Sequence, residues 1–251
     1  MTSMASGSPL PVRPAEPPPS HRARPAASER TYGRLIGALF LAGFVTYGLG
    51  FALVDSVTGD RDLLAGVSAG QTTLMLGAFL MLLTTAVDIG KAVLFYPLVA
   101  RWDRKVALTY LAAMVFEVTM MAVGSLLLLS LVPMAEQVRA GDLGADLAGS
   151  LGALAVDGND IAYQVAQAGL AFGAFFLCVL LYRTALVPRW LAAWGAIGYV
   201  IHFAGASAEL LGSPVSMILL IPGGLFELTF GVWLLVKGLD TGDRTPELVP
   251  T

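Results

Sequence analysis

One uninterrupted apolar run decides the fold class of this chain. Residues 106–131 read VALTYLAAMVFEVTMMAVGSLLLLSL, in which Glu117 is the single charged side chain. An α-helix rises 1.5 Å per residue, so about 20 apolar residues cross a hydrocarbon core roughly 30 Å thick. The run therefore predicts a transmembrane helix.

Five further segments have the same length and apolar character. Hydrophobic residues make up 56% of the 251-residue chain and charged residues only 13%, whereas soluble domains carry about 25% charged residues. We therefore predict an all-α polytopic membrane bundle of six transmembrane helices. The other five spans are Leu35–Val54, Thr72–Ala100, Ile161–Tyr182, Trp190–Ala208 and Val215–Val236.

Composition divides the chain into a membrane domain with a tail at each end. Seven of the first 30 residues are proline, with Ser, Ala and Arg between them, a composition typical of disorder. We expect residues 1–32 to be a disordered Pro/Ala/Arg-rich cytoplasmic tail. Residues 33–238 form the six-helix transmembrane domain, and residues 239–251 form a cytoplasmic C-terminal tail.

The distribution of basic residues predicts the orientation. With both termini placed in the cytoplasm, twelve of the fifteen Lys and Arg residues fall on the cytoplasmic side, two (Arg61 and Arg139) fall outside, and Lys91 lies within a span. Cytoplasmic loops retain positive charge. All four tryptophans then lie near the cytoplasmic interface, where an aromatic belt is expected; they are Trp102, Trp190, Trp194 and Trp233.

The rest of the composition bears on location and partners. Arg outnumbers Lys 12 to 3 in an Ala- and Gly-rich chain, which favours a bacterium with a GC-rich genome and hence the bacterial inner membrane. Basic residues are not gathered in a patch, so nucleic acid is not expected as a partner. The single cysteine, Cys178, excludes an intrachain disulfide and a Cys-based metal site. No cofactor is predicted; the expected partners are the lipid bilayer and either further copies of the chain or a membrane partner protein.

Five ionisable residues within the spans carry the chemical information. Counted from the cytoplasmic end of each helix, all five lie roughly 14 to 18 Å deep, near the middle of the bilayer. A charged residue there costs roughly 2.5 to 3.5 kcal/mol on insertion scales, so such residues face the bundle interior. These candidates for a central polar site are Asp88, Lys91, Glu117, His202 and Glu227.

Spacing separates structural from functional interpretations of these residues. Asp88 and Lys91 are three residues apart on one helix face, which favours a local ion pair. Glu117 and Glu227 have no oppositely charged neighbour on their own helices, and with His202 they are plausible members of a proton relay. No His pair with metal-ligand spacing occurs, so a metal site is disfavoured.

Polar residues nearer the outer end of the bundle are also candidates. Glu209 marks a candidate pathway toward the exterior, and Gln164 and Gln167 either line the same pathway or form hydrogen bonds between helices. Asn159 and Asp160 are expected to cap the fourth span. Leucines at 143, 147, 151 and 154 predict a short amphipathic helix on the outer membrane face.

Three short motifs carry a resemblance to a known family. Together they resemble an uncharacterised family of bacterial multi-pass membrane proteins, classed as a domain of unknown function, over about residues 34–238. The resemblance implies the architecture and the intramembrane glutamates Glu117 and Glu227, but no activity. Members often have an arginine shortly before the first glutamate, where this chain reads Ala113-Met114-Val115, which weakens an ion-pair role for Glu117. The motifs are Tyr96-Pro97-Leu98 followed by Phe116-Glu117, Val187-Pro188-Arg189-Trp190-Leu191 followed by Trp194-Gly195, and Pro222 with Phe226-Glu227 before Trp233-Leu234-Leu235.

These observations leave three functional hypotheses. The first is a small proton-coupled transporter with a carboxylate and histidine site at the bilayer midplane. The second is a membrane sensor or accessory subunit whose buried polar residues are structural. An intramembrane enzyme is least favoured, because the spans hold no HExxH motif and no Ser/His pair.

Overall fold

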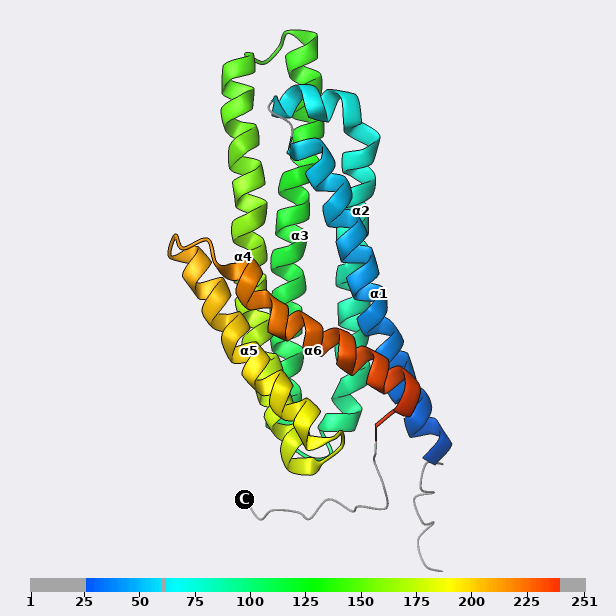
Figure 1. The fold of residues 1–251 in the computed structure, drawn as a ribbon. Helices are drawn as coiled ribbons and strands as arrows, with labels where there is room; N and C mark the ends of the chain where they lie inside the picture. Colours follow the sequence, from blue (N-terminus) through cyan, green and yellow to red (C-terminus); the bar gives the residue numbers. More distant parts are fainter. Residues whose placement is uncertain (1–25, 60–61, 240–251) are drawn as a thin grey trace, which may run out of the picture.

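The computed structural model describes residues 26–59 and 62–239, and within them it is entirely helical (Figure 1). Six of its helices are long and apolar enough to cross a membrane. The predicted six-helix membrane bundle is therefore confirmed, and each predicted span matches one helix with at most one residue beyond its end. The helices are α1 (Ala26–Thr58), α2 (Leu63–Val99), α3 (Arg104–Ala140), α4 (Ala145–Thr184), α5 (Arg189–Leu210) and α6 (Ser216–Lys237).

Short polar residues set the helix ends in the connecting turns. The Asp62 side chain accepts a hydrogen bond from the amide of Ala65 at the start of α2, and the Asp103 side chain accepts from Lys105 and Val106 at the start of α3. These carboxylates satisfy amides that have no partner within the helix. Gly141 ends α3 with a φ of +83°, a conformation that glycine adopts without strain.

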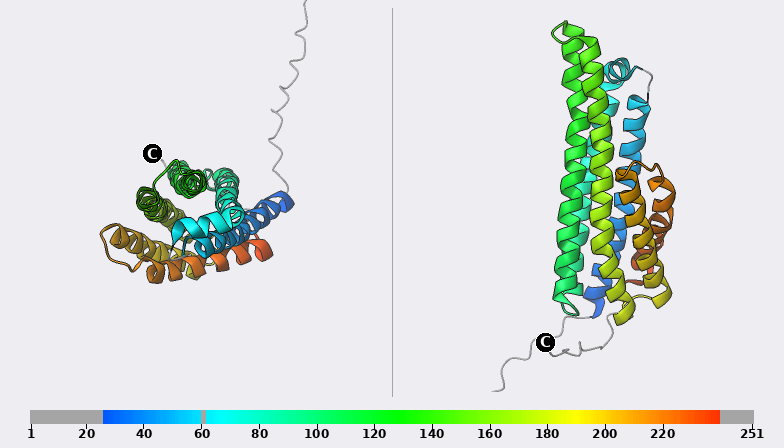
Figure 2. Two further views of the ribbon diagram at one scale, coloured as in Figure 1. Left: turned by 90° about the horizontal axis from the view of Figure 1, so that it is seen from above. Right: turned by 90° about the vertical axis from the view of Figure 1, so that its left-hand side faces the viewer.

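The helices differ greatly in length. α2, α3 and α4 have 37, 37 and 40 residues, whereas α5 and α6 have 22 each. At 1.5 Å per residue α4 is about 60 Å long and α5 about 33 Å. The α5–α6 hairpin consequently ends well below the α3–α4 connection (Figures 1 and 2). We call the end where α3 joins α4 the hairpin end, and the end where α1 begins and α6 finishes the termini end.

The prediction of a separate amphipathic helix around residues 143–154 was wrong. These residues from Ala145 onward belong to α4, which runs straight through them. Next to the leucines of this segment, α4 carries small buried residues such as Ala148 and Ala155, which pack in the core at the hairpin end. Packing against α1, α2 and α3 therefore keeps these residues within the bundle as the first turns of α4. α2 in turn starts at Leu63, before the predicted Thr72, and is kinked where Gly70 leaves helical geometry.

The six helices form a closed ring. Each helix packs against its neighbours in sequence, and α6 returns to pack against α1. Seen along the bundle, α5 and α6 lie along one side of the ring, opposite α2 and α3 (Figure 2, left). The contact that closes the ring is tight, because a Cβ atom on Gly37 of α1 would lie 2.5 Å from the carbonyl oxygen of Gly231 in α6.

Two hydrophobic cores fill the ring at different heights. Toward the termini end, all six helices contribute to a core that contains Phe40, Phe95, Phe226 and Phe230. Toward the hairpin end, α1 to α4 alone form a second core around Leu74 and other apolar residues. Between the two cores, α5 and α6 are still part of the ring. Polar side chains line the interior of the ring at this height.

Both predicted tails fall mainly outside the described residues. Residues 1–25 and 240–251 are not described, whereas residues 26–32 of the predicted N-terminal tail are part of α1. Gly33 packs against Gly238 and Leu239, so α1 begins and α6 finishes at the same end of the bundle.

The ring closure can be tested with two glycines of α1. Gly37→Val inserts a side chain against the α6 backbone and is expected to destabilise the protein by about 1 to 3 kcal/mol through overpacking. A Cβ on Gly48 meets no atom within 4 Å, so Gly48→Val is the matched control. Thermal unfolding in detergent micelles measures both variants. Equal stability of the two variants would contradict the α1–α6 contact.

Candidate functional site

A cavity of about 160 Å³ lies inside the ring, between the two cores. All six helices contribute side chains to its wall. The five ionisable residues singled out from the sequence all line this cavity, although they come from four different helices. They are Asp88 and Lys91 on α2, Glu117 on α3, His202 on α5 and Glu227 on α6, joined by Gln167 on α4. We call this space the central cavity.

Asp88 and Lys91 form the ion pair that their spacing predicted. The Lys91 ammonium lies 2.8 Å from a carboxylate oxygen of Asp88, and both residues are buried. The same ammonium lies 4.3 Å from the centre of the Phe40 ring, where the ring's negative face attracts a cation. The pair neutralises two charges whose separate burial would be costly.

Glu227 is held by a tyrosine that sequence reasoning missed. The Tyr199 hydroxyl on α5 donates a hydrogen bond of 2.8 Å to a carboxylate oxygen of Glu227 on α6. Tyr199 is three residues before His202 and therefore shares its helix face, which is a signal the sequence did offer. A bonded pair of this kind orients Glu227 and ties the two helices together.

Glu117 and His202 are the least satisfied polar groups of the cavity. Each residue is only 4% exposed, yet Glu117 Oε2 and both ring nitrogens of His202 have no hydrogen-bond partner among the described residues. Buried polar groups in proteins are nearly always hydrogen-bonded, and leaving one unsatisfied costs about 1 to 3 kcal/mol. A proton or a polar solute in the cavity would be able to bind to these atoms.

Glycine places His202 against α6. α5 and α6 cross closely, because a Cβ on Gly198 would lie 3.2 Å from the Cα of Gly223. A Cβ on Gly223 would itself lie 3.1 Å from His202 Nδ1. The glycines of Pro222-Gly223-Gly224 therefore allow α5 and α6 to cross closely beside the central cavity, and α6 remains continuous through this segment.

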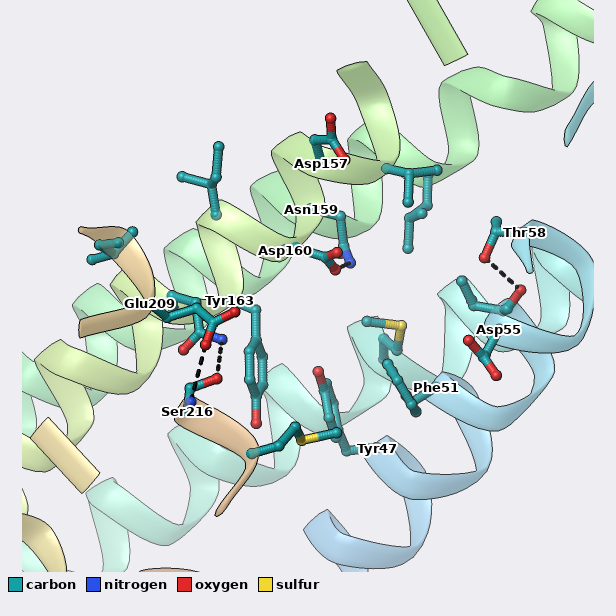
Figure 3. A pocket seen from close by; sticks show the side chains of 18 of the residues that line it. Tyr47, Phe51, Asp55, Thr58, Asp157, Asn159, Asp160, Tyr163, Glu209 and Ser216 are labelled. Atoms are coloured by element: carbon teal, nitrogen blue, oxygen red, sulfur yellow. Dashed lines mark hydrogen bonds between the residues drawn. The ribbon is translucent and has the colours of Figure 1, made fainter. Parts of the chain in front are cut away.

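A second and larger cavity, of about 750 Å³, lies toward the hairpin end near the α5–α6 loop (Figure 3). Among the described residues, four carboxylates line it and no Lys, Arg or His does; they are Asp55, Asp157, Asp160 and Glu209. We call it the acidic cavity. A Glu209 oxygen accepts a 3.0 Å hydrogen bond from the Ser216 amide, and Gln164 donates to the Ser216 hydroxyl.

The three residues considered for an outer pathway divide between the cavities. Gln164 and Glu209 line the acidic cavity, whereas Gln167 lines the central cavity. The prediction that Asn159 and Asp160 cap the fourth span was wrong, because α4 begins at Ala145 and both residues lie inside it. The Asn159 amide donates to Asp160 at the wall of the acidic cavity. The helix continues past them since Gly124 of α3 lets Asn159 pack closely.

Tyr47 and Tyr163 belong to the walls of both cavities. Their rings stack with centres 5.5 Å apart and planes within 13° of parallel, and Figure 3 shows them side by side between α1 and α4. Sequence reasoning missed this role, because a tyrosine near a helix end is usually interpreted as a residue of the membrane interface.

Within residues 26–59 and 62–239, no three His, Cys, Asp or Glu side chains are placed to hold a metal ion.

A closed ring of six membrane-length helices around a buried polar cavity defines a polytopic membrane protein. Residues 35–238 match the model of the family described as Domain of unknown function (DUF4386). The chain belongs to this family, in agreement with the resemblance seen in its motifs. Comparison with the curated proteins and with the solved structures finds no match.

The ion pair yields a stability prediction. Lys91→Met leaves the Asp88 carboxylate buried without its partner and is expected to cost about 3 to 5 kcal/mol. The double variant Asp88→Asn/Lys91→Met should recover most of this loss, because no charge remains unpaired. Unfolding free energies in mixed micelles measure the effect, with exposed Lys105→Met as a control expected to stay within about 0.5 kcal/mol. A double variant no more stable than Lys91→Met would refute the pairing.

Proposed function

We propose that this protein is a proton-coupled transporter of a small solute, with the central cavity as the place where proton and solute bind. The observation that supports it best is the central cavity itself, which gathers five ionisable side chains from four helices. Ionisable residues at membrane depth are costly and commonly mark ion or substrate pathways. A site at the midplane between helices is the usual position in small transporters.

The charges of the cavity support proton exchange at Glu117. Asp88 and Lys91 neutralise one another, and Tyr199 donates to Glu227. Glu117 is left without an ionic partner, and it faces the same cavity as His202. A carboxylate in this position is stabilised when it binds either a proton or a solute. Such alternative binding is what couples the movement of protons to the movement of the solute.

The proposed orientation puts both termini in the cytoplasm of a bacterial cell, with the bundle in the inner membrane. The positive residues of the connections and the four tryptophans support this orientation, because they lie toward the termini end. The acidic cavity then lies toward the exterior. Water would reach the central cavity from that side past Tyr47 and Tyr163.

An accessory or sensor subunit is the second candidate, and the polar contacts between helices favour it. Thr46 on α1 bonds to Thr84 on α2 at 2.8 Å, and Gln164 on α4 bonds to Ser216 on α6 at 2.8 Å. Such bonds hold membrane helices together without any transport role. This candidate requires a partner protein or a further copy that remains bound through mild detergent extraction.

Reconstituted vesicles test the transport proposal. Purified protein in liposomes that contain a pH-sensitive dye is offered glucose, alanine, succinate or choline, which represent neutral, zwitterionic, anionic and cationic solutes. At least one solute should change the lumenal pH in wild-type vesicles. Glu117→Gln should slow this change at least tenfold, since an amide cannot exchange the proton.

Glu136→Gln is the matched control for this experiment. Glu136 lies at the hairpin end of α3, outside both cavities, and accepts a hydrogen bond from Gln71, which an amide oxygen can also accept. The transport rate of the Glu136→Gln variant should equal that of the wild-type protein. If none of the four solutes moves protons, or if Glu117→Gln transports as wild type does, the proposal is wrong.

Labelling of single cysteines tests the orientation. Asp142→Cys at the hairpin end should react with a membrane-impermeant maleimide in intact cells, whereas Arg104→Cys should react only after the membrane is opened. Native Cys178 is 2% exposed and provides an unreactive background. Labelling of Arg104→Cys alone in intact cells would reverse the assigned orientation.

A further inference from the structure

Both cavities carry an excess of negative groups. Within residues 26–59 and 62–239, the acidic cavity has four carboxylates and no basic residue in its wall, and the central cavity has three carboxyl groups and one ammonium. Counted as ionised, the central groups sum to −2 with His202 neutral. Such walls raise the local concentration of cations. They disfavour an anionic solute along the whole path.

Aromatic rings accompany the carboxylates. Phe51, Tyr47 and Tyr163 stack in a row, with ring centres 6.4 Å and 5.5 Å apart, beside the acidic cavity. In the central cavity the Phe40 ring already holds the Lys91 ammonium on its face. Carboxylates combined with aromatic faces are the groups that recognise organic ammonium ions.

The central cavity has buried polar atoms that no described residue satisfies. Glu117 Oε2 and the two His202 nitrogens are buried in its wall without partners among the described residues. Its volume of about 160 Å³ is close to that of an engineered cavity of roughly 150 Å³ that binds benzene. The solute that fits has about six or seven non-hydrogen atoms.

The two cavities are separated by the stacked tyrosines. Tyr47 and Tyr163 contribute to both walls, so the boundary is one layer of side chains. On the opposite side, toward the termini end, the buried aromatic core that contains Phe95 and Phe230 lies between all six helices. Of these two barriers, the tyrosine pair is thinner than the aromatic core.

We propose that the central cavity binds a small organic ammonium ion, and that the acidic cavity, past Tyr47 and Tyr163, is the route by which this ion exchanges with water. This assignment rests on the proposed transport function and specifies its solute class. The ammonium group binds where a proton would otherwise satisfy Glu117. Cation and proton are therefore alternative occupants, and the transport they support is an exchange of one for the other.

Titration calorimetry of the purified full-length protein tests the ligand class. Choline is the probe, and its uncharged isostere 3,3-dimethylbutan-1-ol is the control. Choline should bind at least tenfold more tightly than the isostere, because only the cation compensates the carboxylates. This comparison uses wild-type protein alone, so it does not depend on the folding of any variant. Equal binding of the two probes, or binding of neither, overturns the assignment.

Two aspartates of α4 test the route. Asp160 lines the acidic cavity, whereas Asp146 lies further toward the hairpin end and outside it. In vesicles reconstituted with the Asp160→Asn variant, choline should enter severalfold more slowly at low salt than in vesicles with wild-type protein. The equilibrium affinity of the variant for choline should stay within twofold of the wild-type value. Asp146→Asn should leave both quantities unchanged. Identical rates for the two variants overturn the acidic route.

The vesicle experiment separates failure of this assignment from failure of transport. If succinate or glucose moves protons and choline does not, the transport function stands and the ammonium assignment falls. If choline binds with the predicted selectivity and no solute moves protons, the cation site stands and the transport function falls.

Discussion

The cost of a charged group in hydrocarbon governs this structure. Asp88, Lys91, Glu117 and Glu227 cannot face lipid without a large loss of stability. The three helices that carry them, α2, α3 and α6, must therefore turn these residues toward one interior. A closed ring of six helices meets this requirement. Its closure depends on glycine contacts such as Gly37 against Gly231, where two backbones touch without a side chain between them.

Unequal helix lengths decide where the polar interior meets water. The core at the termini end is built by all six helices and the core at the hairpin end by four. Because α5 and α6 stop after 22 residues, a large cavity opens beside their connecting loop. The central cavity lies just beneath it. The polar site is thus closed toward one end by a thick aromatic core and toward the other by two tyrosines.

The polar groups of the interior fall into two kinds. The Asp88–Lys91 ion pair and the Tyr199–Glu227 hydrogen bond are complete in themselves, and each can be explained by stability alone. Glu117 and His202 lack this explanation, since their buried atoms have no partner among the described residues. This contrast within one cavity is the physical basis for proposing a functional role for Glu117 and His202 and a structural role for the other polar residues.

The sequence by itself determined the six spans, the Asp88–Lys91 pair and the common level of the ionisable residues along their helices, because hydrophobic length and helical spacing are local properties. It did not determine the close crossing at Gly198 and Gly223, the continuation of α4 through Asn159, or the place of Tyr47 and Tyr163 between two cavities. These features depend on which helix faces meet. Only the tertiary structure decided them, because small residues permit close contact with any neighbour and do not specify which one.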